Sequence, residues 1–161
     1  QINFGKQNRG KVKFLNSEVY IMIRAMYNND IEALRKIYLE TRRSDFKWLK
    51  GHQLDISDFD KDTEGEIILV AVEKSQVVGF ISIWEADSFI HHLFVLPGFS
   101  KRGYGSQLLS AGLDSISLPA QLKCVSLNKD ALEFYLRRGW SVISKGVSGD
   151  GEYKLMQYDN E

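Results

Sequence analysis

Apolar positions along the chain fall into short runs that predict strands, and between these runs apolar residues recur with helical spacing. Strands are predicted at 19–25, 66–74, 77–85, 89–96, 121–127, 140–145 and 152–158. The runs 66–74 and 77–85 are apolar on both faces, which is typical of central strands, and only Ser75 and Gln76 separate them. They therefore predict a hairpin at the centre of a sheet. The last two runs predict a closing hairpin across 148–151.

Three segments have the spacing and the end signals of helices. The first is predicted to begin at Asn29, an N-cap with Glu32 three residues later. Its buried face should comprise Ile31, Leu34, Tyr38 and Thr41. The second is expected to end near Ser117, and the third to run from an N-cap at Asn128 to a C-terminal glycine, Gly139.

This order of elements predicts a single α/β domain over residues 19–161. A helix joins the strands 89–96 and 121–127, so these two should lie parallel within an otherwise antiparallel sheet. Residues 1–18 are polar and basic with little periodicity. We expect them to lie outside the fold as an extension, a processed segment or an added sequence. The stretch 44–64 is less regular and predicts at most one short helix.

Composition narrows the class of partner. Lys plus Arg and Asp plus Glu each number 21, and the pI is near 7.0, which argues against a nucleic-acid partner because such domains are clearly basic. The single cysteine, Cys124, excludes an internal disulfide and favours a reducing, cytoplasmic setting. No apolar run approaches the ~18 residues of a membrane span. We therefore expect a cytoplasmic protein without a nucleic-acid or membrane partner.

The stretch from 89 to 109 is the strongest functional signal. A strand closed by Pro97 leads through a basic loop, with Lys101 and Arg102, into the start of a helix. Free backbone N–H groups and the helix dipole make such a junction an anion site, and Gly103 and Gly105 allow close backbone approach. An ordinary strand–loop–helix joint with solvated basic side chains would have the same local pattern.

Two motifs in the chain together resemble the GNAT superfamily of N-acetyltransferases. The first is the family's acetyl-coenzyme A loop, Q/R-x-x-G-x-G/A after a strand that ends in V-x-P. The matching residues are Val95, Leu96, Pro97, Ser100, Lys101, Arg102, Gly103, Tyr104 and Gly105. Ser100 departs from the family's Gln or Arg, which should weaken side-chain support without abolishing binding. The second is an N-x-x-A-x-x-F-Y-x-x-x-G-F block, represented by Asn128, Ala131, Phe134, Tyr135, Gly139 and Trp140, with Trp in place of Phe.

The resemblance covers residues 20–158 and implies the GNAT fold, a mixed sheet whose parallel pair 89–96 and 121–127 splays apart at the coenzyme site. It implies acetyl-CoA as cofactor and transfer of its acetyl group to a primary amine of a small molecule, peptide or protein, by direct attack in a ternary complex. A homodimer is also compatible with family habit. The alternative function is a GNAT-fold sensor or interaction module that binds coenzyme A without turnover.

The resemblance also implies where the cofactor lies. Backbone groups of three residues on the splayed strand, Leu93, Phe94 and Val95, would pair with the pantetheine arm, and a backbone N–H near Leu93 or Phe94 would stabilise the developing oxyanion. The pyrophosphate would lie on the backbone of Ser100 to Ser106. Asn128 and Ala131 would contact the pantetheine or hold the end of the strand before them.

Two proton transfers need side chains. Tyr135 occupies the family position of the group that protonates the leaving thiolate; a buried core tyrosine is the simpler interpretation. For the base, His91 and Glu85 compete. The neighbouring His92 should face away from His91, because adjacent strand residues point to opposite faces, so no metal site is expected. Cys124 should be a buried strand residue and no nucleophile.

Aromatic side chains are the candidates for the acceptor site. Phe46, Trp48 and Trp84 could line a substrate cleft, because loops over a rigid sheet tend to carry specificity. Covering the core is the alternative role of the aromatics in the 44–64 stretch.

Overall fold

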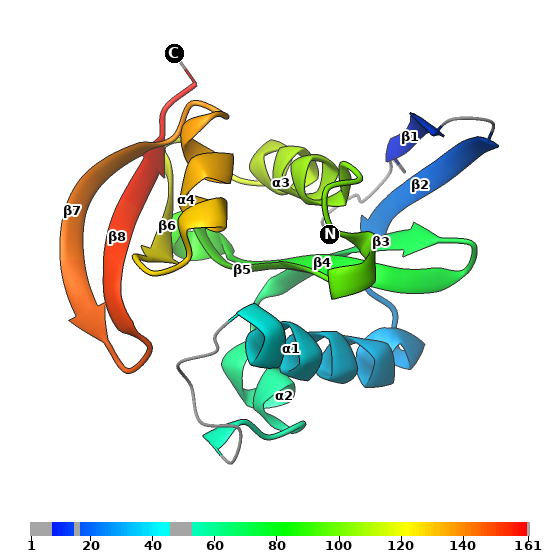
Figure 1. Ribbon diagram of the computed structural model, residues 1–161, viewed down its shortest axis with the longest axis horizontal. Coiled ribbons are helices and arrows are strands. Elements are labelled where there is room, and N and C mark those ends of the chain that lie inside the picture. Colours follow the sequence, from blue (N-terminus) through cyan, green and yellow to red (C-terminus); the bar gives the residue numbers. More distant parts are fainter. Residues whose placement is uncertain (1–7, 15–16, 46–52, 161) are drawn as a thin grey trace.

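The computed structural model describes residues 8–14, 17–45 and 53–160, and these form one mixed sheet with helices on both faces (Figure 1). The strands are β1 (Asn8–Phe14), β2 (Ser17–Ala25), β3 (Ile67–Glu73), β4 (Gln76–Trp84), β5 (Phe89–Val95), β6 (Ala120–Val125), β7 (Ser141–Ser148) and β8 (Gly151–Tyr158). The helices are α1 (Ile31–Asp45), α2 (Asp58–Asp62), α3 (Tyr104–Asp114) and α4 (Lys129–Leu136). The element order predicted for residues 20–158 is therefore confirmed.

The sheet has the order β1-β2-β3-β4-β5-β6-β8-β7, and every neighbouring pair is antiparallel except β5 and β6. Each face has its own apolar cluster. One cluster joins β4 and β5 to α3 and α4, with Ile81, Leu108 and Trp140 buried at its centre. The other joins the opposite face of β3 and β4 to α1 and α2, through Leu34 and Phe80. The central strands are apolar on both sides because helices cover both sides.

The parallel pair separates soon after it forms. β5 pairs with β6 only through Phe89 with Gln121 and Ile90 with Leu122. The remaining residues of β5 keep their partners on β4, whereas β6 keeps its partners on β8. The splayed pair predicted for this sheet is therefore confirmed, and the sheet opens between β5 and β6 beyond Ile90.

Helix α3 packs very close to the open strands. A Cβ on Gly112 would lie 2.7 Å from Cδ1 of Ile81 and 3.1 Å from Cδ1 of Ile83 on β4, so any other residue would require these side chains to shift. Gly112 is in the last turn of α3, so this contact fixes the C-terminal part of the helix against β4, and the loop 96–103 joins the end of β5 to its start.

Several local predictions differ from the structure. The segment 1–18 was expected outside the fold, yet β1 pairs with β2, which itself begins at Ser17. The alternation of basic and apolar residues from Arg9 to Phe14 is the strand signal that a low overall hydrophobicity concealed. The central hairpin turns at Lys74 and Ser75, one residue earlier than predicted, and both residues have positive φ.

The start of the first helix differs from the prediction as well. Asn29 lies in a 3₁₀ turn, Asn28–Asp30, that precedes α1. The side chain of Asp30 instead accepts the backbone N–H of Tyr27 at 2.7 Å, and it pairs with Arg24 at 2.7 Å. A carboxylate bound by both an N–H group and a guanidinium is a stronger end signal than a neutral amide. The pKa of Asp30 is lowered chiefly by the hydrogen bond from Arg24.

Candidate functional site

The loop before α3 has the backbone of an anion site. Lys101 and Gly103 both adopt left-handed φ, 60° and 90°, and Gly103 is the N-cap residue of α3. The turn leaves the first N–H groups of the helix without helical acceptors, directed away from the helix end. The side chain of Tyr104 is 1% exposed in the core, and burial raises its pKa to about 12, so only its backbone is available to a ligand.

Arg138 adds a cation to this end that the sequence analysis missed. Its guanidinium donates to Oγ of Ser106 from Nε at 2.9 Å and from NH2 at 2.6 Å, and it lies 3.7 Å from the centre of the Phe134 ring. Ser106 is in the first turn of α3, whereas Arg138 follows α4. The pair therefore ties the end of one motif to the beginning of the other, a contact that spacing alone does not reveal.

The opened edge of β5 presents alternate backbone groups to the gap. Leu96 N–H donates to Val78 O at 2.8 Å, and the same register pairs Phe94 with Phe80. In an antiparallel ladder the residues between such pairs direct their N–H and C=O groups to the other side. The backbone N–H and C=O groups of Leu93 and Val95 therefore point into the gap, and those of Phe94 point to β4.

The second motif lies across the gap, on β6 and α4. The side chain of Asn128 accepts the N–H of Ala131 at 3.2 Å and caps α4. Tyr135 is buried between Trp140 and Phe134, and burial, with a smaller effect of Cys124, raises its pKa. Cys124 is buried as predicted, and burial raises the pKa of its thiol to about 11.

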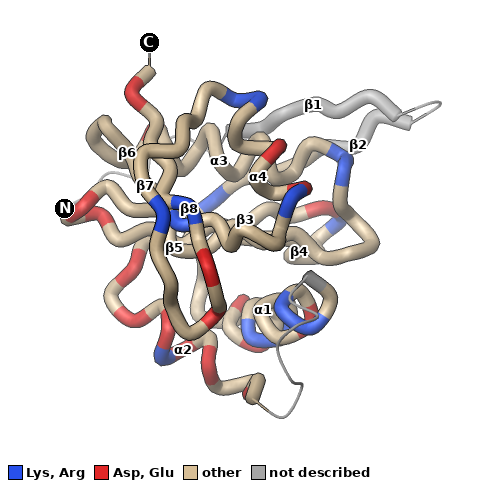
Figure 2. Tube along the Cα trace, turned by 60° about the vertical axis from the view of Figure 1, so that its left-hand side comes forward, with Lys and Arg blue, Asp and Glu red and all other residues tan. Residues whose placement is uncertain are grey.

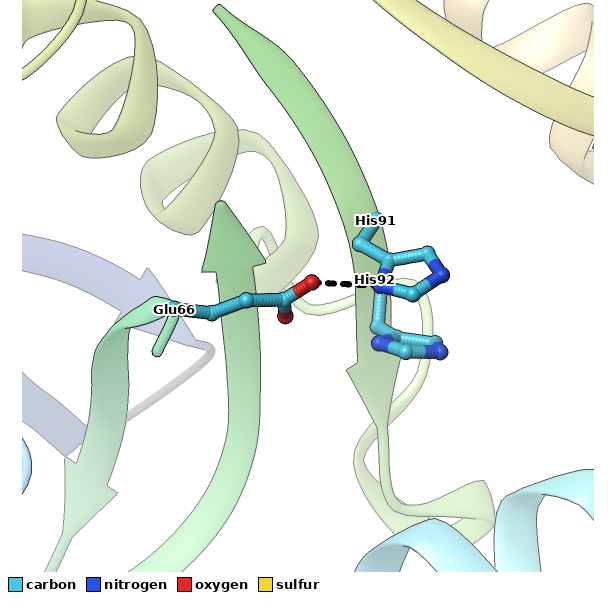
Figure 3. Close-up of side chains that lie close together, drawn as sticks. All are labelled: Glu66, His91 and His92. Carbon is cyan, nitrogen blue, oxygen red and sulfur yellow. Dashed lines mark hydrogen bonds and ion pairs between the residues drawn. The ribbon is translucent and has the colours of Figure 1, made fainter. Parts of the chain in front are cut away.

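His91 and His92 lie on the same face of the sheet, which corrects the expectation that they diverge (Figure 3). Ser82 is opposite His92 and Ile83 is opposite Ile90, so His91 is an extra residue in β5, a β-bulge. The two ring centroids are 4.1 Å apart. In an uninterrupted strand His91, four residues before Val95, would share its face; because of the bulge, His91 lies on the opposite face.

His91 forms an ion pair with a carboxylate that was not predicted. Nδ1 of His91 lies 2.5 Å from Oε1 of Glu66, whose side chain is only 5% exposed, whereas the His91 side chain is 46% exposed. The pKa of His91 is raised, first by the hydrogen bond to Glu66, although burial and Lys123 oppose this. Because Glu66 is the acceptor, Nδ1 carries a proton, and Nε2 of the neutral ring is left as the basic atom.

His92 belongs to a buried chain of hydrogen bonds. Its Nδ1 lies 2.8 Å from Ser82 Oγ, its Nε2 lies 3.3 Å from Tyr38 Oη, and Tyr38 donates to Oδ2 of Asp62 at 2.7 Å. Burial, with the charges of His91 and Arg42, lowers the pKa of His92 to about 3, so the ring is neutral. A neutral ring satisfies the chain when Ser82 donates to Nδ1 and Nε2–H donates to Tyr38.

The predicted divergence of the histidines was the argument against a metal, and it was wrong. Ligand atoms of Glu66, His91 and His92 all lie within 4.8 Å of one another. A metal bound by His92 would, however, have to displace one of its hydrogen bonds, because Ser82 and Tyr38 occupy its two ring nitrogens. In this arrangement Glu66 is bonded to Nδ1 of His91, and Nε2 of His91 stays available to accept a proton.

A cavity of about 380 Å³ opens in front of His91. Four carboxylates line it, Asp62, Glu64, Glu66 and Asp87, together with the aromatic residues Trp84 and Phe89. Of the predicted acceptor residues, Trp84 is therefore in this wall, and Phe46 and Trp48 lie outside the described residues. Glu85 begins an exposed 3₁₀ turn beside Trp84 and does not line the cavity.

The sequence contains a signal for this cavity that was overlooked. β3 and β5 are both antiparallel to β4, so both strands begin at the same end of the sheet, where β4 finishes. Acidic residues precede each of them, at 62, 64 and 66 and again at 85 and 87. The predicted hairpin, combined with the acidic residues before each of these two strands, would have predicted that this end of the sheet is acidic.

Comparison with known families agrees with this geometry. Residues 28–140 match the family model described as Acetyltransferase (GNAT) family. The chain belongs to the GNAT acetyltransferase family. Its members use acetyl-CoA, and this GNAT acetyltransferase carries both matched motifs on the two sides of its opened sheet. No curated protein sequence matches the chain significantly.

Solved structures share the fold of this GNAT acetyltransferase at low sequence identity. Apo YjaB from Escherichia coli is 20% identical with a TM-score of 0.73, over 86% of this chain and 97% of that one. PaiA N-acetyltransferase from Thermoplasma acidophilum, in complex with coenzyme A, is 17% identical with a TM-score of 0.71, over 86% and 98%. YncA from Salmonella typhimurium, with its cofactor acetyl-CoA, is 18% identical with a TM-score of 0.70, over 88% and 94%.

No described helix of the chain is both long and apolar enough to cross a membrane.

Proposed function

We propose that the protein is an N-acetyltransferase that transfers the acetyl group of acetyl-CoA to a primary amine within a ternary complex. The observation that supports this most is the opened edge of β5, which runs from a basic helix start at one end to the His91–Glu66 pair at the other. Acetyl-CoA is a thioester of a long, phosphorylated thiol. Its phosphates suit the anion site, its extended arm suits the free backbone groups of the strand, and its acetyl group would then lie towards the base.

The residues at the basic end fit the cofactor. The left-handed turn at Lys101 and Gly103 exposes the N–H groups of Tyr104 to Ser106, and Arg138 reaches the same turn. These groups would hold the pyrophosphate. Leu93 and Val95 offer alternate backbone groups to the pantetheine arm, which narrows the predicted set because Phe94 faces β4. Asn128 supports the facing side by capping α4.

His91 is the proposed base. A primary amine is mostly protonated near neutral pH, and the ammonium form has no lone pair for attack. Nε2 of neutral His91 can accept the proton of an amine in the cavity, directly or through water, while Glu66 stabilises the imidazolium that results. Glu85 is the weaker candidate, because it is absent from the cavity wall.

Tyr135 is the proposed acid. Acetyl-CoA supplies a thioester whose carbon–sulfur bond breaks as the amide bond forms. The thiolate so released has an unperturbed pKa near ~8.5, and a neutral Tyr135 hydroxyl can protonate it or stabilise it by hydrogen bonding. The high pKa of the Cys124 thiol leaves it protonated and agrees with direct attack by the amine.

The test is an acetyl-CoA-dependent thiol-release assay over a panel of primary amines, with coenzyme binding followed separately by calorimetry. We expect His91→Gln and Tyr135→Phe each to lower turnover by ~10²–10⁴, the usual contribution of acid–base groups, and to leave acetyl-CoA binding nearly unchanged. Tyr27→Phe is the matched control for Tyr135→Phe, because Tyr27 is exposed and remote from the gap.

The same assay separates the enzyme from a non-catalytic sensor. Tight acetyl-CoA binding without amine-dependent thiol release from any amine would favour the sensor. Full activity of His91→Gln alongside a loss in Glu85→Gln would transfer the role of base to Glu85. A homodimer and a cytoplasmic location remain predictions; the exposed β7 residues Ile143 and Val147 offer an apolar edge for self-association.

A further inference from the structure

The cavity in front of His91 is much more acidic than a site for a single neutral amine requires. Four carboxylates line it, and no lysine or arginine does among the described residues. Several of the acidic positions of the chain lie beside α2 in Figure 2. The opposing cation is Lys123 on β6, whose charge lowers the pKa of His91, and its ammonium lies over the Tyr153 ring at 4.8 Å. The balance of charge around the cavity therefore favours a ligand with more than one positive charge.

Glu66 indicates independently that a donor is missing from this cavity. Its side chain is only 5% exposed, Oε1 is bonded to His91, and Oε2 is buried without a hydrogen-bond partner among the described residues. A buried carboxylate oxygen without a donor is unfavourable. Glu66 lines the cavity, so a turn of its carboxylate would bring Oε2 within reach of a ligand N–H group next to the proposed base.

The aromatic residues of the cavity suit a cationic aliphatic chain. Trp84 is 43% exposed at the wall, and Phe89 lines the same space. An ammonium group over an indole face is attracted by the ring, and methylene groups bury apolar surface against both rings. Carboxylates for the charge and flat aromatic walls for the chain are the two features that a linear diamine needs.

We propose that the acceptor is a small linear aliphatic di- or polyamine. This inference rests on the proposed acetyl transfer at His91. One amino group, neutral after giving its proton to His91, is the one acetylated. A second stays protonated, held by Glu64 and Asp87 beside Trp84, while Asp62 is fixed by its bond from Tyr38 and adds to the negative potential. Amines that carry a carboxylate at the same distance are rejected by like charge.

The test compares three acceptors of equal chain length: 1,4-diaminobutane, butylamine and 4-aminobutanoate. At saturating acetyl-CoA we expect kcat/KM for the diamine to exceed that for the monoamine by ~10–100-fold, as one or more charge-assisted contacts would give, and the amino acid to be the poorest. The double variant Glu64→Gln/Asp87→Asn should remove most of this preference, chiefly by raising KM for the diamine. Asp114→Asn, an exposed change on α3, is the matched control.

Each outcome either supports or overturns the proposal. Equal kcat/KM for diamine and monoamine, or a preference unchanged in the double variant, would overturn the diamine while leaving acetyl transfer standing. A lysine-containing peptide acetylated more efficiently than any diamine would also overturn it. If no amine is acetylated, the proposed function fails, and calorimetry with 1,4-diaminobutane then tests the inference by itself. Binding by the wild type that is lost in the double variant would support the selectivity of the cavity for diamines. No binding by the wild type would overturn it.

Discussion

The two ends of β5 carry opposite charge and are built in opposite ways. At the C-terminal end, the loop to α3 offers backbone N–H groups and the cations Lys101 and Arg138. At the N-terminal end, the cavity offers carboxylate side chains around His91. An anionic cofactor and a cationic acceptor would thus approach from different ends of one strand and meet at its opened middle. With opposite charge at its two ends, a single strand would keep the two proposed substrates from competing for one site.

The basic end should depend on backbone shape more than on any side chain. In Gly103→Glu, the substituted residue would have to keep the backbone φ of 90°, which is unfavourable for a residue with a side chain. Its carboxylate would also place a negative charge at the N-terminus of α3. We expect acetyl-CoA affinity measured by calorimetry to fall by ~100-fold or more, since at least two charge-assisted hydrogen bonds are lost. Binding of a diamine at the other end should change little.

Two further variants give this result its meaning. Gly149→Glu makes the same chemical change in the β7–β8 turn, where a Cβ has open space, and should bind acetyl-CoA as the wild type does. Gly103→Ala isolates the effect of backbone strain. If Gly103→Glu bound acetyl-CoA normally, the basic end would not be the anion site, and the contrast between the ends would collapse.

Arg138 sharpens the comparison, because it is a side-chain contribution at an end otherwise made of backbone. Arg138→Gln keeps a hydrogen-bond donor near Ser106 but removes the charge. We expect acetyl-CoA affinity to fall by ~10-fold and its dependence on salt concentration to weaken. Arg137→Gln is the control, because Arg137 pairs with Glu133 on the exposed side of α4. An equal loss in both variants would mean that only general positive charge matters.

The smallest expected effect is a shift along the pH axis at the acidic end. Glu66 raises the pKa of His91 above its usual 6.5, and a base must be neutral to accept a proton. Activity of the wild type should therefore rise with pH through this raised pKa. In Glu66→Gln the pKa falls, so the acidic limb of the kcat profile should move to lower pH, although maximal turnover also drops.

The measurement uses one amine at saturation for all variants, so that ionisation of the acceptor is common to them. Glu40→Gln, on the exposed face of α1, should leave the limb where it is. A limb that stays in place in Glu66→Gln would show that His91 is not the group being titrated.

The basic end could be predicted from sequence because it is local. The residues from Val95 to Ser106 are contiguous, and Asn128 to Trp140 form one further segment, so motif spacing brings each set together with little tertiary information. Even so, the contact between Arg138 and Ser106 joins the two segments and required the packing of α3 against α4.

The acidic end could not be predicted in the same way, because two segments that are far apart in the sequence, 62–66 and 84–91, supply it. Asp62 ends α2, Glu66 precedes β3 and Asp87 precedes β5. The period-two rule also failed at His91, because it assumes a ladder without interruption. Nothing in the local sequence marks the bulge, since it arises from how β5 pairs with β4.

The bulge gives His91 an unusual status among the residues of the site. Without it, Ile90 and His92 would still lie opposite Ile83 and Ser82, and the two strands would form an uninterrupted ladder. His91 is thus supernumerary: the proposed base is an insertion into an otherwise complete strand. A relative shorter by one residue here would keep every strand pairing and lose the proposed chemistry, so aligning the two proteins would show a gap in place of a substitution.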